Sequence, residues 1–426
     1  MSERKFPPGF KWGAATASYQ VEGGIENNDW AEAARDGKVP PCGRACGHYE
    51  RYKEDFDIAK SLGHNCHRLS IEWARIEPEE GRFDEREIEH YRTVLRALHA
   101  RGIEPFITLW HFTLPLWFSR TGGFERKDAP QIFARYCAYT AGKLSGLCTH
   151  FSTMNEPMVF VSNGWGRGTW PPFCKWPGIE YLAITSSGRS INPRSQLGFG
   201  NIVRYLSVMR HLGAAHNRAY DAIKKIAPQT EVGIVKQVIL YHANANPFNQ
   251  LFAWVMNWFW TYQFMNRVIA RCDVIGLNYY LHKKFGDRKV YDKTDMDWDV
   301  FPEGICEALM MLKGYGKPVY VSEAGVADAR DRIRAGYIRA TVRCMHSAIE
   351  NGVDVRGFMY WSLLDNYEWA SGFGPRFGLV EIDYATQARR VRESAYVYKQ
   401  ICEKNALIDP AVNVGDSLFS TPTGNS

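Results

Sequence analysis

PVYVSEAG (318–325) and VRGFMYWSL (355–363) are two apolar segments of strand length, and the residues between them decide the fold. Apolar side chains recur there at helical spacing along one face, and Asn351-Gly352 supplies a stop. The face consists of Ile333, Tyr337, Ile338, Thr341, Cys344, Met345, Ala348 and Ile349. A strand, a helix and a second strand in this order predict two parallel strands joined by a crossover helix.

The same alternation extends back to the N-terminus. Helical patterns run from Ile88 to Leu98, stopping at Gly102, and from Val391 to Cys402. The most apolar segment, Leu251 to Phe264, is rich in tryptophan and predicts a buried helix. Six further strands are predicted at FKWGAATAS (10–18), CHRLSIEW (66–73), EPFITLWHF (104–112), HFSTMNE (150–156), EVGIVKQV (231–238) and VIGLNYY (274–280).

The eight predicted strands are almost continuously apolar, which indicates a parallel sheet covered by helices. An open doubly wound sheet would fit this count, but no GxGxxG or GxxxxGK turn follows any strand. We therefore predict an α/β fold, a single (β/α)8 TIM barrel over residues 1–407. The stretch 163–195 is rich in Gly, Pro, Trp and Ser and predicts a long loop, and residues 408–426 predict a polar, frayed tail.

Composition narrows the class of protein. The chain has 426 residues, 45% hydrophobic and 23% charged, which excludes disorder as the main state. The net charge is +6, and the sequence contains no block of five like charges. Both observations argue against a nucleic-acid partner. No run of about 18 apolar residues predicts a membrane span, and MSERKFPPGFKWG lacks the apolar core of a signal peptide. Ten cysteines without such a signal predict free thiols and a cytoplasmic protein.

Polar side chains gather at the carboxyl ends of the predicted strands, where a barrel holds its active site. Carboxylates and amides bind hydroxyl groups, and indoles stack on the C–H face of a sugar ring, so this set suits a sugar. A Ser/His/Asp arrangement is missing, and Cys42, Cys46 and His48 lack the second ligand pair of a zinc site. The set comprises Gln20, Glu22, Arg68, Glu72, Trp110, His111, Asn155, Glu156, Asn278, Tyr280, Glu323, Trp361, Asp365, Glu368 and Trp369.

Two of these carboxylates suit glycoside hydrolysis, which needs a pair flanking the scissile bond. Glu156 and Glu323 end the fourth and seventh predicted strands, so they would face each other across the barrel mouth. No cation adjoins Glu156 in the sequence, so desolvation could keep it protonated, whereas Arg68 and Tyr280 could hold Glu323 ionised. Either glutamate alone could equally cap a helix or pair with an arginine. Their joint occurrence favours catalysis.

At these residues the chain resembles family 1 of the glycoside hydrolases, which contains retaining β-glucosidases and β-galactosidases. The resemblance runs from about Phe6 to Cys402 and is closest to the archaeal and related branch. It rests on the motifs FKWGAATASYQVEGG, HRLSIEWARIEP, TLWHFTLPLW, TMNEP, GLNYY, SEAGVADARD and WSLLDNYEWASGFGPRFGL.

The resemblance implies a role for each residue. Glu156 would be the general acid/base and Glu323 the nucleophile, with Arg68 and Tyr280 contacting the nucleophile and Asn278 supporting these groups. Asn155 would bind the sugar 2-hydroxyl and Trp361 would stack beneath the ring. The 3-, 4- and 6-hydroxyls would be held by Gln20, His111, Glu368 and Trp369. Trp165 and Phe112 would wall the leaving-group site. The resemblance implies no metal or organic cofactor, and a small β-glycoside as the substrate.

The chain departs from the family pattern in two places. Ser322-Glu323-Ala324-Gly325 stands where the family usually has TENG, and the loops 281–300 and 326–333 are short, which predicts an open leaving-group side. The subfamily that takes 6-phosphorylated sugars carries serine, lysine and tyrosine where this chain has Glu368, Pro375 and Phe377. We therefore predict unphosphorylated sugars, since a carboxylate would repel the phosphate.

Two alternatives remain at this point. A transglycosidase would use the same covalent intermediate with a sugar or alcohol in place of water. A catalytically silent sugar-binding relative would typically lack one of the two glutamates, and both are present.

Overall fold

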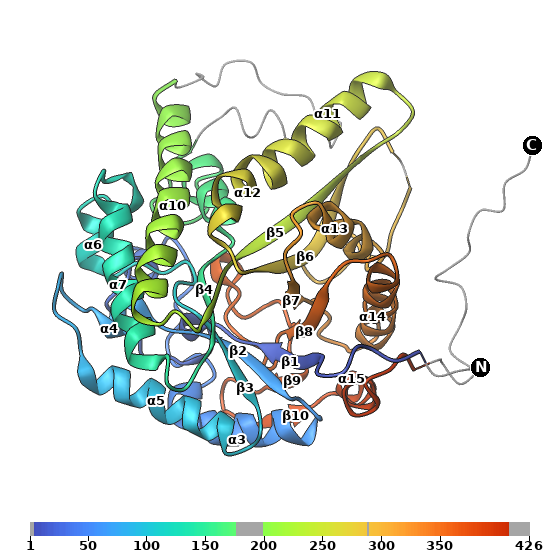
Figure 1. The fold of residues 1–426 in the computed structure, drawn as a ribbon, viewed down its shortest axis with the longest axis horizontal. Coiled ribbons are helices and arrows are strands. Elements are labelled where there is room, and N and C mark those ends of the chain that lie inside the picture. The colour runs from blue at the N-terminus through green and yellow to red at the C-terminus, as the bar shows by residue number, and fades with distance from the viewer. Residues whose placement is uncertain (1–3, 176–198, 288, 409–426) are drawn as a thin grey trace, which may run out of the picture.

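A computed structural model describes residues 4–175, 199–287 and 289–408, and Figure 1 shows its strands surrounded by helices. Eight parallel strands form a closed barrel in chain order, and β1 pairs with both β2 and β8. All eight predicted strands and the barrel are confirmed. The strands are β1 (Lys11–Ala15), β2 (Cys66–Ser70), β3 (Glu104–Thr108), β4 (His150–Asn155), β5 (Glu231–Ala243), β6 (Val274–Phe285), β7 (Val319–Ala324) and β8 (Val355–Trp361).

The helices predicted from apolar spacing form close to the expected bounds. In α5 (Glu85–His99), Asp84 caps the first turn with its side chain, and the predicted stripe from Ile88 to Leu98 is buried. In α14 (Arg334–Glu350), the helix ends at the predicted Asn351-Gly352 stop. The other main helices are α2 (Asp29–Arg35), α3 (His48–Ser61), α7 (Ala129–Leu144), α10 (Phe199–Ile226), α11 (Pro247–Asn257), α12 (Gln263–Val268), α13 (Gly304–Lys313) and α15 (Glu393–Lys404).

Short elements lie in the connections after the strands. A small antiparallel sheet of β9 (Val380–Ile382) and β10 (Arg389–Val391) was not predicted, since each of its strands has only three residues. The one-turn helices are α1 (Ser18–Val21), α4 (Trp73–Ile76), α6 (Leu116–Arg120) and α8 (Pro157–Val161), and a π-helical turn covers Ser162–Gly166. The predicted loop 163–195 is described only as far as residue 175, and the predicted tail lies outside the described residues apart from Ile408.

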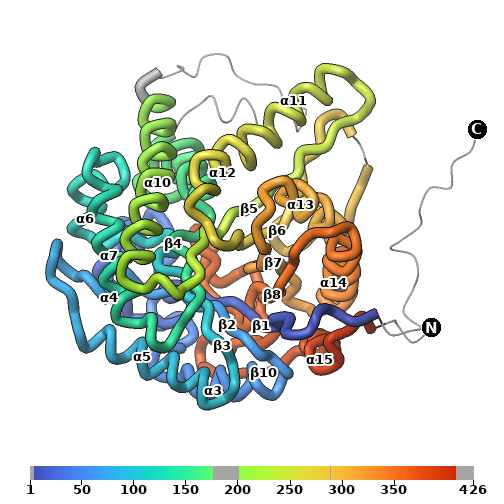
Figure 2. The backbone as a smooth tube through the Cα atoms, viewed as in Figure 1, coloured from blue at the N-terminus to red at the C-terminus, as the bar shows by residue number. Residues whose placement is uncertain are grey.

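All eight predicted strand ends differ from the observed ones, since six strands end earlier than predicted and two, β5 and β6, end later. The first strand stops at Ala15 rather than residue 18, because Ser18 begins helix α1. The strands β5 and β6 run on to Ala243 and Phe285, paired from Leu240↔His282 to Ala243↔Phe285. Figure 2 shows this pair projecting from the barrel beside α11. Sequence periodicity did not predict the extension, because polar residues interrupt its apolar pattern.

The segment Leu251–Phe264 is helical as predicted, but its expected burial is wrong for most of α11. Leu251 is 60% exposed, Trp254 65% and Trp258 46%, whereas Trp260 and Phe264 are buried. Asn257 fixes one face of the helix by accepting a hydrogen bond from the Tyr241 N–H at 3.0 Å and donating to the Tyr241 carbonyl. Apolar periodicity defines such a face without saying whether anything covers the opposite one.

Two sequence expectations concern membrane-spanning helices and the state of the cysteine thiols. Within the described ranges, no helix is both long enough and apolar enough to cross a membrane. All ten cysteine thiols are unpaired, as predicted. Cys42 and Cys46 donate to the Tyr19 and Asp365 carbonyls, and His48 binds Asp55 at 2.7 Å.

Candidate active site

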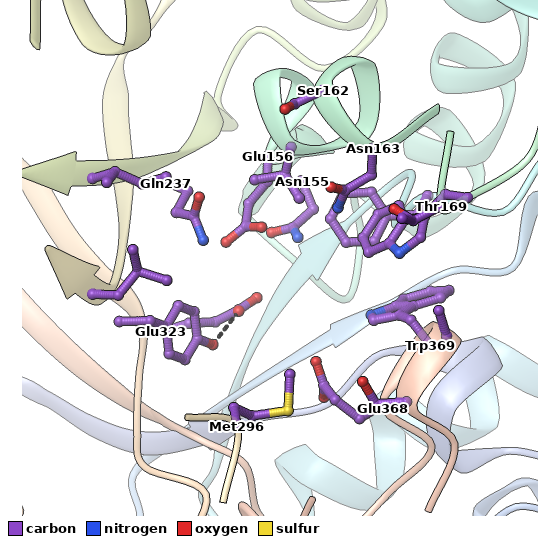
Figure 3. A pocket seen from close by; sticks show the side chains of 18 of the residues that line it. Asn155, Glu156, Ser162, Asn163, Thr169, Gln237, Met296, Glu323, Glu368 and Trp369 are labelled. Atoms are coloured by element: carbon purple, nitrogen blue, oxygen red, sulfur yellow. Dashed lines mark hydrogen bonds between the residues drawn. The ribbon is translucent and has the colours of Figure 1, made fainter. Parts of the chain in front are cut away.

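A cavity of about 390 Å³ opens at the carboxyl ends of the barrel strands. Figure 3 shows its side chains converging from several strands and loops. Most of the predicted site residues line it, namely Gln20, His111, Asn155, Glu156, Tyr280, Glu323, Trp361, Glu368 and Trp369. Arg68 and Asn278 lie directly behind the wall and bind residues that line it.

Glu323 lies at the end of β7 and is held by two donors. Arg68, from β2, pairs with one carboxylate oxygen, and the Tyr280 hydroxyl donates to the other at 2.6 Å. All of these groups are buried or nearly so, which strengthens the interaction. Burial, followed by the Glu323 charge, raises the pKa of Tyr280 well above its usual range, so the phenol keeps its proton and remains a donor.

Glu156 follows β4 in a different environment. Its backbone is left-handed (φ 43°), and its N–H donates to the Val235 carbonyl of β5 at 2.9 Å. The carboxyl is 6% exposed and accepts a hydrogen bond from the Asn278 amide at 2.7 Å. Burial, followed by the negative charge of Glu323, raises its pKa to about 8. Burial and the Glu323 charge thus favour the protonated form of Glu156, and Figure 3 shows the Glu156 and Glu323 side chains pointing into the same cavity.

A chain of amides connects the two carboxyl groups. The side-chain oxygen Oδ1 of Asn155 accepts one hydrogen bond from the Arg68 guanidinium at 2.7 Å and another from the Asn278 side-chain amide at 3.3 Å. The Ser322 hydroxyl donates to the side-chain oxygen Oδ1 of Asn278 at 2.8 Å. The NH₂ of the same side chain is thereby turned toward Glu156. The serine of the SEAG sequence thus orients the partner of Glu156.

The wall opposite Glu156 and Glu323 carries three buried polar atoms without a hydrogen-bond partner among the described residues. They are Oε1 of Gln20, Nδ1 of His111 and Oε2 of Glu368. The Gln20 amide nitrogen is fixed by Asn366 at 3.0 Å and by the Tyr367 carbonyl at 2.8 Å, so its free oxygen is oriented. Because buried polar atoms in proteins are nearly always bonded, these atoms are suited to a polar ligand.

The titrating groups on this wall are neutral at neutral pH. Burial, followed by the Arg68 charge, lowers the pKa of His111 well below its usual range. Burial, followed by the Glu323 charge, raises the pKa of Glu368 to about 8. Neutral imidazole and carboxylic acid groups both donate and accept hydrogen bonds, as a hydroxyl-rich ligand requires.

Aromatic rings enclose this end of the cavity. The His111 ring is stacked with both Trp361 and Trp369, at centroid distances of 6.0 Å and interplanar angles of 16° and 10°. Phe112 and Trp170 pack edge-to-face beside them, 4.9 Å apart, and both line the cavity. The rings provide flat apolar surfaces next to the open hydrogen-bonding atoms.

Five expected positions lie elsewhere. Glu22 pairs with Arg75 at 3.0 Å, Asp365 with Arg392 at 2.8 Å, and Glu72 accepts from Thr113. The Trp110 indole donates to the Thr113 carbonyl, so it belongs to the core. Trp165 was expected to wall the leaving-group site, but its indole binds Glu125 at 2.7 Å and faces a second cavity. Strand-end position identifies the rim of a barrel without distinguishing inward from outward side chains.

Sequence reasoning missed part of the wall. Gln237 lies at the end of a predicted strand and could have been found by the rule that identified Asn155. Lys283 lies on the unpredicted extension of β6. Other missed lining residues come from loops or from the helical turns after β4 and β5, where spacing carries no signal: Ser162, Asn163, Arg167, Thr169, Trp170, Trp260, Met296 and Trp298. The loop 281–300, expected to leave the site open, supplies Lys283, Met296 and Trp298.

The described residues contain no cluster of three or more histidine, cysteine or acidic side chains that could bind a metal ion.

Comparison with known proteins identifies close relatives in bacteria and archaea. The chain is 32% identical to β-glucosidase A of Thermotoga maritima, over 96% of this chain and 100% of that protein. It is 30% identical to a β-galactosidase of Sulfolobus acidocaldarius, over 94% and 96% of the two chains. Among solved structures, a β-glycosidase from Pyrococcus horikoshii superposes with a TM-score of 0.85 at 35% identity, covering 96% and 97%.

The model of glycosyl hydrolase family 1 matches residues 2–271 and 249–407, so it spans the barrel and both carboxyl groups. The chain therefore belongs to glycosyl hydrolase family 1 and is a glycoside hydrolase.

Proposed function

We propose that the protein is an exo-acting, retaining β-glycosidase that removes terminal β-linked sugars. The main support is the contrast between two carboxyl groups in one cavity. Glu156 is kept protonated by burial and by the Glu323 charge, whereas Glu323 is bound by Arg68 and Tyr280. A retaining mechanism needs this division between a proton donor and an ionised nucleophile.

The first step forms a covalent glycosyl-enzyme. The Glu323 carboxylate attacks the anomeric carbon, the bond to the leaving oxygen breaks, and the Glu156 proton passes to that oxygen. In the second step Glu156, now ionised, takes a proton from water while the water oxygen attacks the anomeric carbon. The bond to Glu323 breaks and its electron pair returns to the carboxylate. Two inversions leave the β configuration unchanged.

The unpartnered atoms suit a neutral sugar ring. Gln20, His111 and Glu368 would bind the 3-, 4- and 6-hydroxyls together with Trp369, while Asn155 would bind the 2-hydroxyl and Trp361 would stack on the ring. The Trp361 and Trp369 rings stacked on His111 support this placement. We propose glucose as the main sugar, with galactose and fucose also accepted, since relatives are named β-glucosidase and β-galactosidase.

Phosphorylated sugars fit this site poorly. Glu368 and Phe377, which stand at two of the positions used for phosphate in the 6-phosphosugar subfamily, both line the cavity and provide no positive charge. The nearby Arg376 binds Asp365 at 3.4 Å and the Ile382 carbonyl at 3.0 Å, so its charge is already engaged. The cytoplasm is the proposed location, because ten unpaired thiols suit a reducing compartment.

The test is hydrolysis of nitrophenyl glycosides at pH 6. The panel consists of the β-glucoside, β-galactoside, β-fucoside, 6-phospho-β-glucoside and α-glucoside. Release from the unphosphorylated β-glycosides alone, with the β-anomer as the first product seen by NMR, is expected. Release from the α-glucoside, an α-configured product, or no turnover by folded protein would contradict the proposal. Glycoside products that dominate at high acceptor concentration would indicate a transglycosidase instead.

A further inference from the structure

The ionisable side chains that line the active-site cavity divide into buried carboxyl groups and exposed cations. Its only acidic lining residues among those described are Glu156, Glu323 and Glu368. Two cationic side chains, Arg167 and Lys283, also line the cavity, and both are exposed to solvent. The cavity therefore combines buried carboxyl groups with cations that solvent can reach.

Arg167 and Lys283 lie on the Glu156 side. Arg167 directly follows the π-helical turn Ser162–Gly166, which continues helix α8 from Glu156, and its N–H donates to the Ser162 carbonyl at 2.7 Å. Lys283 lies on the extension of β6, five residues beyond Asn278, the amide that binds Glu156. Since the acid must reach the leaving oxygen, these cations lie where the leaving group would sit. This placement depends on the proposed function.

Neither cation has a carboxylate within ion-pair distance among the described residues, although their neighbours do. Lys284 and Lys293 bind Asp299 at 3.2 and 2.7 Å, and the remaining nearby acid, Asp297, is exposed and 3.9 Å from Lys293. Asp297 and Asp299, the two carboxylates whose charges act on Lys283, thus form their ion pairs with Lys284 and Lys293. The exposed side chains of Arg167 and Lys283 remain available to a ligand.

The two cations also act on each other. Desolvation, followed by the Arg167 charge, lowers the pKa of Lys283. Two like charges facing one space destabilise each other, and an anion between them would relieve the repulsion. Neutral donors flank the same wall, since Ser162, Asn163 and Gln237 line the cavity there.

We propose that Arg167 and Lys283 form a subsite for an anionic aglycone, so that the preferred substrates are β-glycosides whose leaving group carries a carboxylate, sulfate or phosphate. The neutral sugar occupies the deep end, where an anion would meet the carboxylate of Glu323. The charged part of the aglycone remains near the two cations and the solvent. This arrangement also attracts anionic substrates to the cavity at low ionic strength.

The test uses two substrates that differ only in charge. These are the β-glucosides of 4-hydroxyphenylacetate and of its amide, in which the methylene insulates the phenol, so the two leaving groups have similar reactivity. The ratio of their kcat/KM values is measured at low salt for the native enzyme and for an R167Q/K283Q variant. We expect the native enzyme to favour the carboxylate by roughly three- to tenfold, since each exposed ion pair contributes up to about a fivefold effect. High salt and the variant should both bring the ratio close to one.

A matched variant removes two charges elsewhere. Lys127 and Lys225 are exposed and do not line the cavity, so K127Q/K225Q should retain the native ratio. The amide substrate measures any change in hydrolysis that is independent of charge, so the charge effect is taken from the ratio alone, and K127Q/K225Q should hydrolyse the amide at the native rate. A native ratio of one or less, or an equal loss of preference in the two variants, would overturn the anionic subsite. Failure of the native enzyme on both substrates and on the nitrophenyl β-glycosides would instead overturn the proposed function.

Discussion

Glu156 and Glu323 differ in what surrounds them, and replacing each should have a different consequence. Glu156→Ala removes the proposed proton donor, so glycosides with poor leaving groups such as alkanols should lose roughly 10²–10⁴-fold in kcat/KM. Activated aryl glycosides need little proton donation in the first step and should lose much less there. Glu323→Ala removes the proposed nucleophile and should abolish turnover of both classes. Steady-state kinetics on one alkyl and one dinitrophenyl glycoside measure this difference. Equal losses for both classes in Glu156→Ala would contradict the assignment.

The charge of Glu323 should also set the pH dependence. Burial and that charge raise the pKa of Glu156 to about 8, and hydrolysis needs Glu156 protonated, so kcat/KM should fall as the pH rises through this value. Glu323→Gln removes the negative charge, and the pKa of Glu156 should then be lower. Titration of the Glu156 carboxyl by ¹³C NMR in both proteins measures the change. An unchanged or higher pKa in Glu323→Gln would refute electrostatic coupling between the two groups.

The sequence predicted the residues of the site that lie at strand ends better than those that come from the loops. Asn155, Glu156 and Glu323 end apolar strands, so strand position and chemistry together placed them in the cavity. The same rule also selected Glu22 and Asp365, whose ion pairs with Arg75 and Arg392 depend on contacts between distant segments. No local pattern distinguishes a catalytic carboxylate from one that is paired in this way.

At the scale of elements, β7 and β8 approach each other closely where they carry the site. A Cβ added at Gly325 would lie 1.9 Å from the Trp361 carbonyl oxygen, so Gly325→Ala must displace one of the two strand ends. We expect it to lower the free energy of unfolding by about 1–3 kcal/mol. It should also reduce kcat/KM, because Glu323 and Trp361 move with those ends. Chemical denaturation and nitrophenyl glycoside kinetics measure both effects.

Gly336→Ala provides the control for that substitution. Gly336 lies in α14, and an added Cβ there would meet nothing within 4 Å. Alanine is favoured over glycine in a helix interior by about 0.5–1 kcal/mol, so this variant should be slightly more stable and fully active. If Gly325→Ala and Gly336→Ala had similar free energies of unfolding and similar kcat/KM values, the close approach of β7 and β8 at Gly325 would not restrict the residue at that position.

The elements themselves were predictable to different degrees. Strands buried on both faces are continuous apolar runs, and α5 and α14 carry clear stripes, so these elements could be predicted. The extension of β5 and β6 depends on pairing between the two strands, and the exposure of Trp254 depends on what packs against α11. Both are tertiary properties that a local pattern does not contain.

The whole barrel assembles the site from strands far apart in the sequence, so ligand binding should stabilise the entire fold. A basic piperidine sugar mimic such as deoxynojirimycin would satisfy the free atoms of Gln20, His111 and Glu368 and place its cation beside Glu323. At 100 times its dissociation constant, such a ligand adds about 2.7 kcal/mol to the free energy of unfolding. For a protein of this size that corresponds to a rise in Tm of roughly 1–3 °C.

The comparison that isolates charge uses glucose as the neutral ligand and Glu323→Gln as the variant protein. In the native protein the cationic mimic should bind more tightly and raise Tm more than glucose at the same concentration, because only the mimic gains an ion pair with a buried carboxylate. In Glu323→Gln this advantage should shrink, while the hydroxyl contacts common to both ligands persist. Differential scanning calorimetry over a range of ligand concentrations measures both changes. An equal advantage in the two proteins would mean that the cation binds elsewhere, and stabilisation by neither ligand would mean that the unpartnered atoms of this cavity do not recognise a sugar.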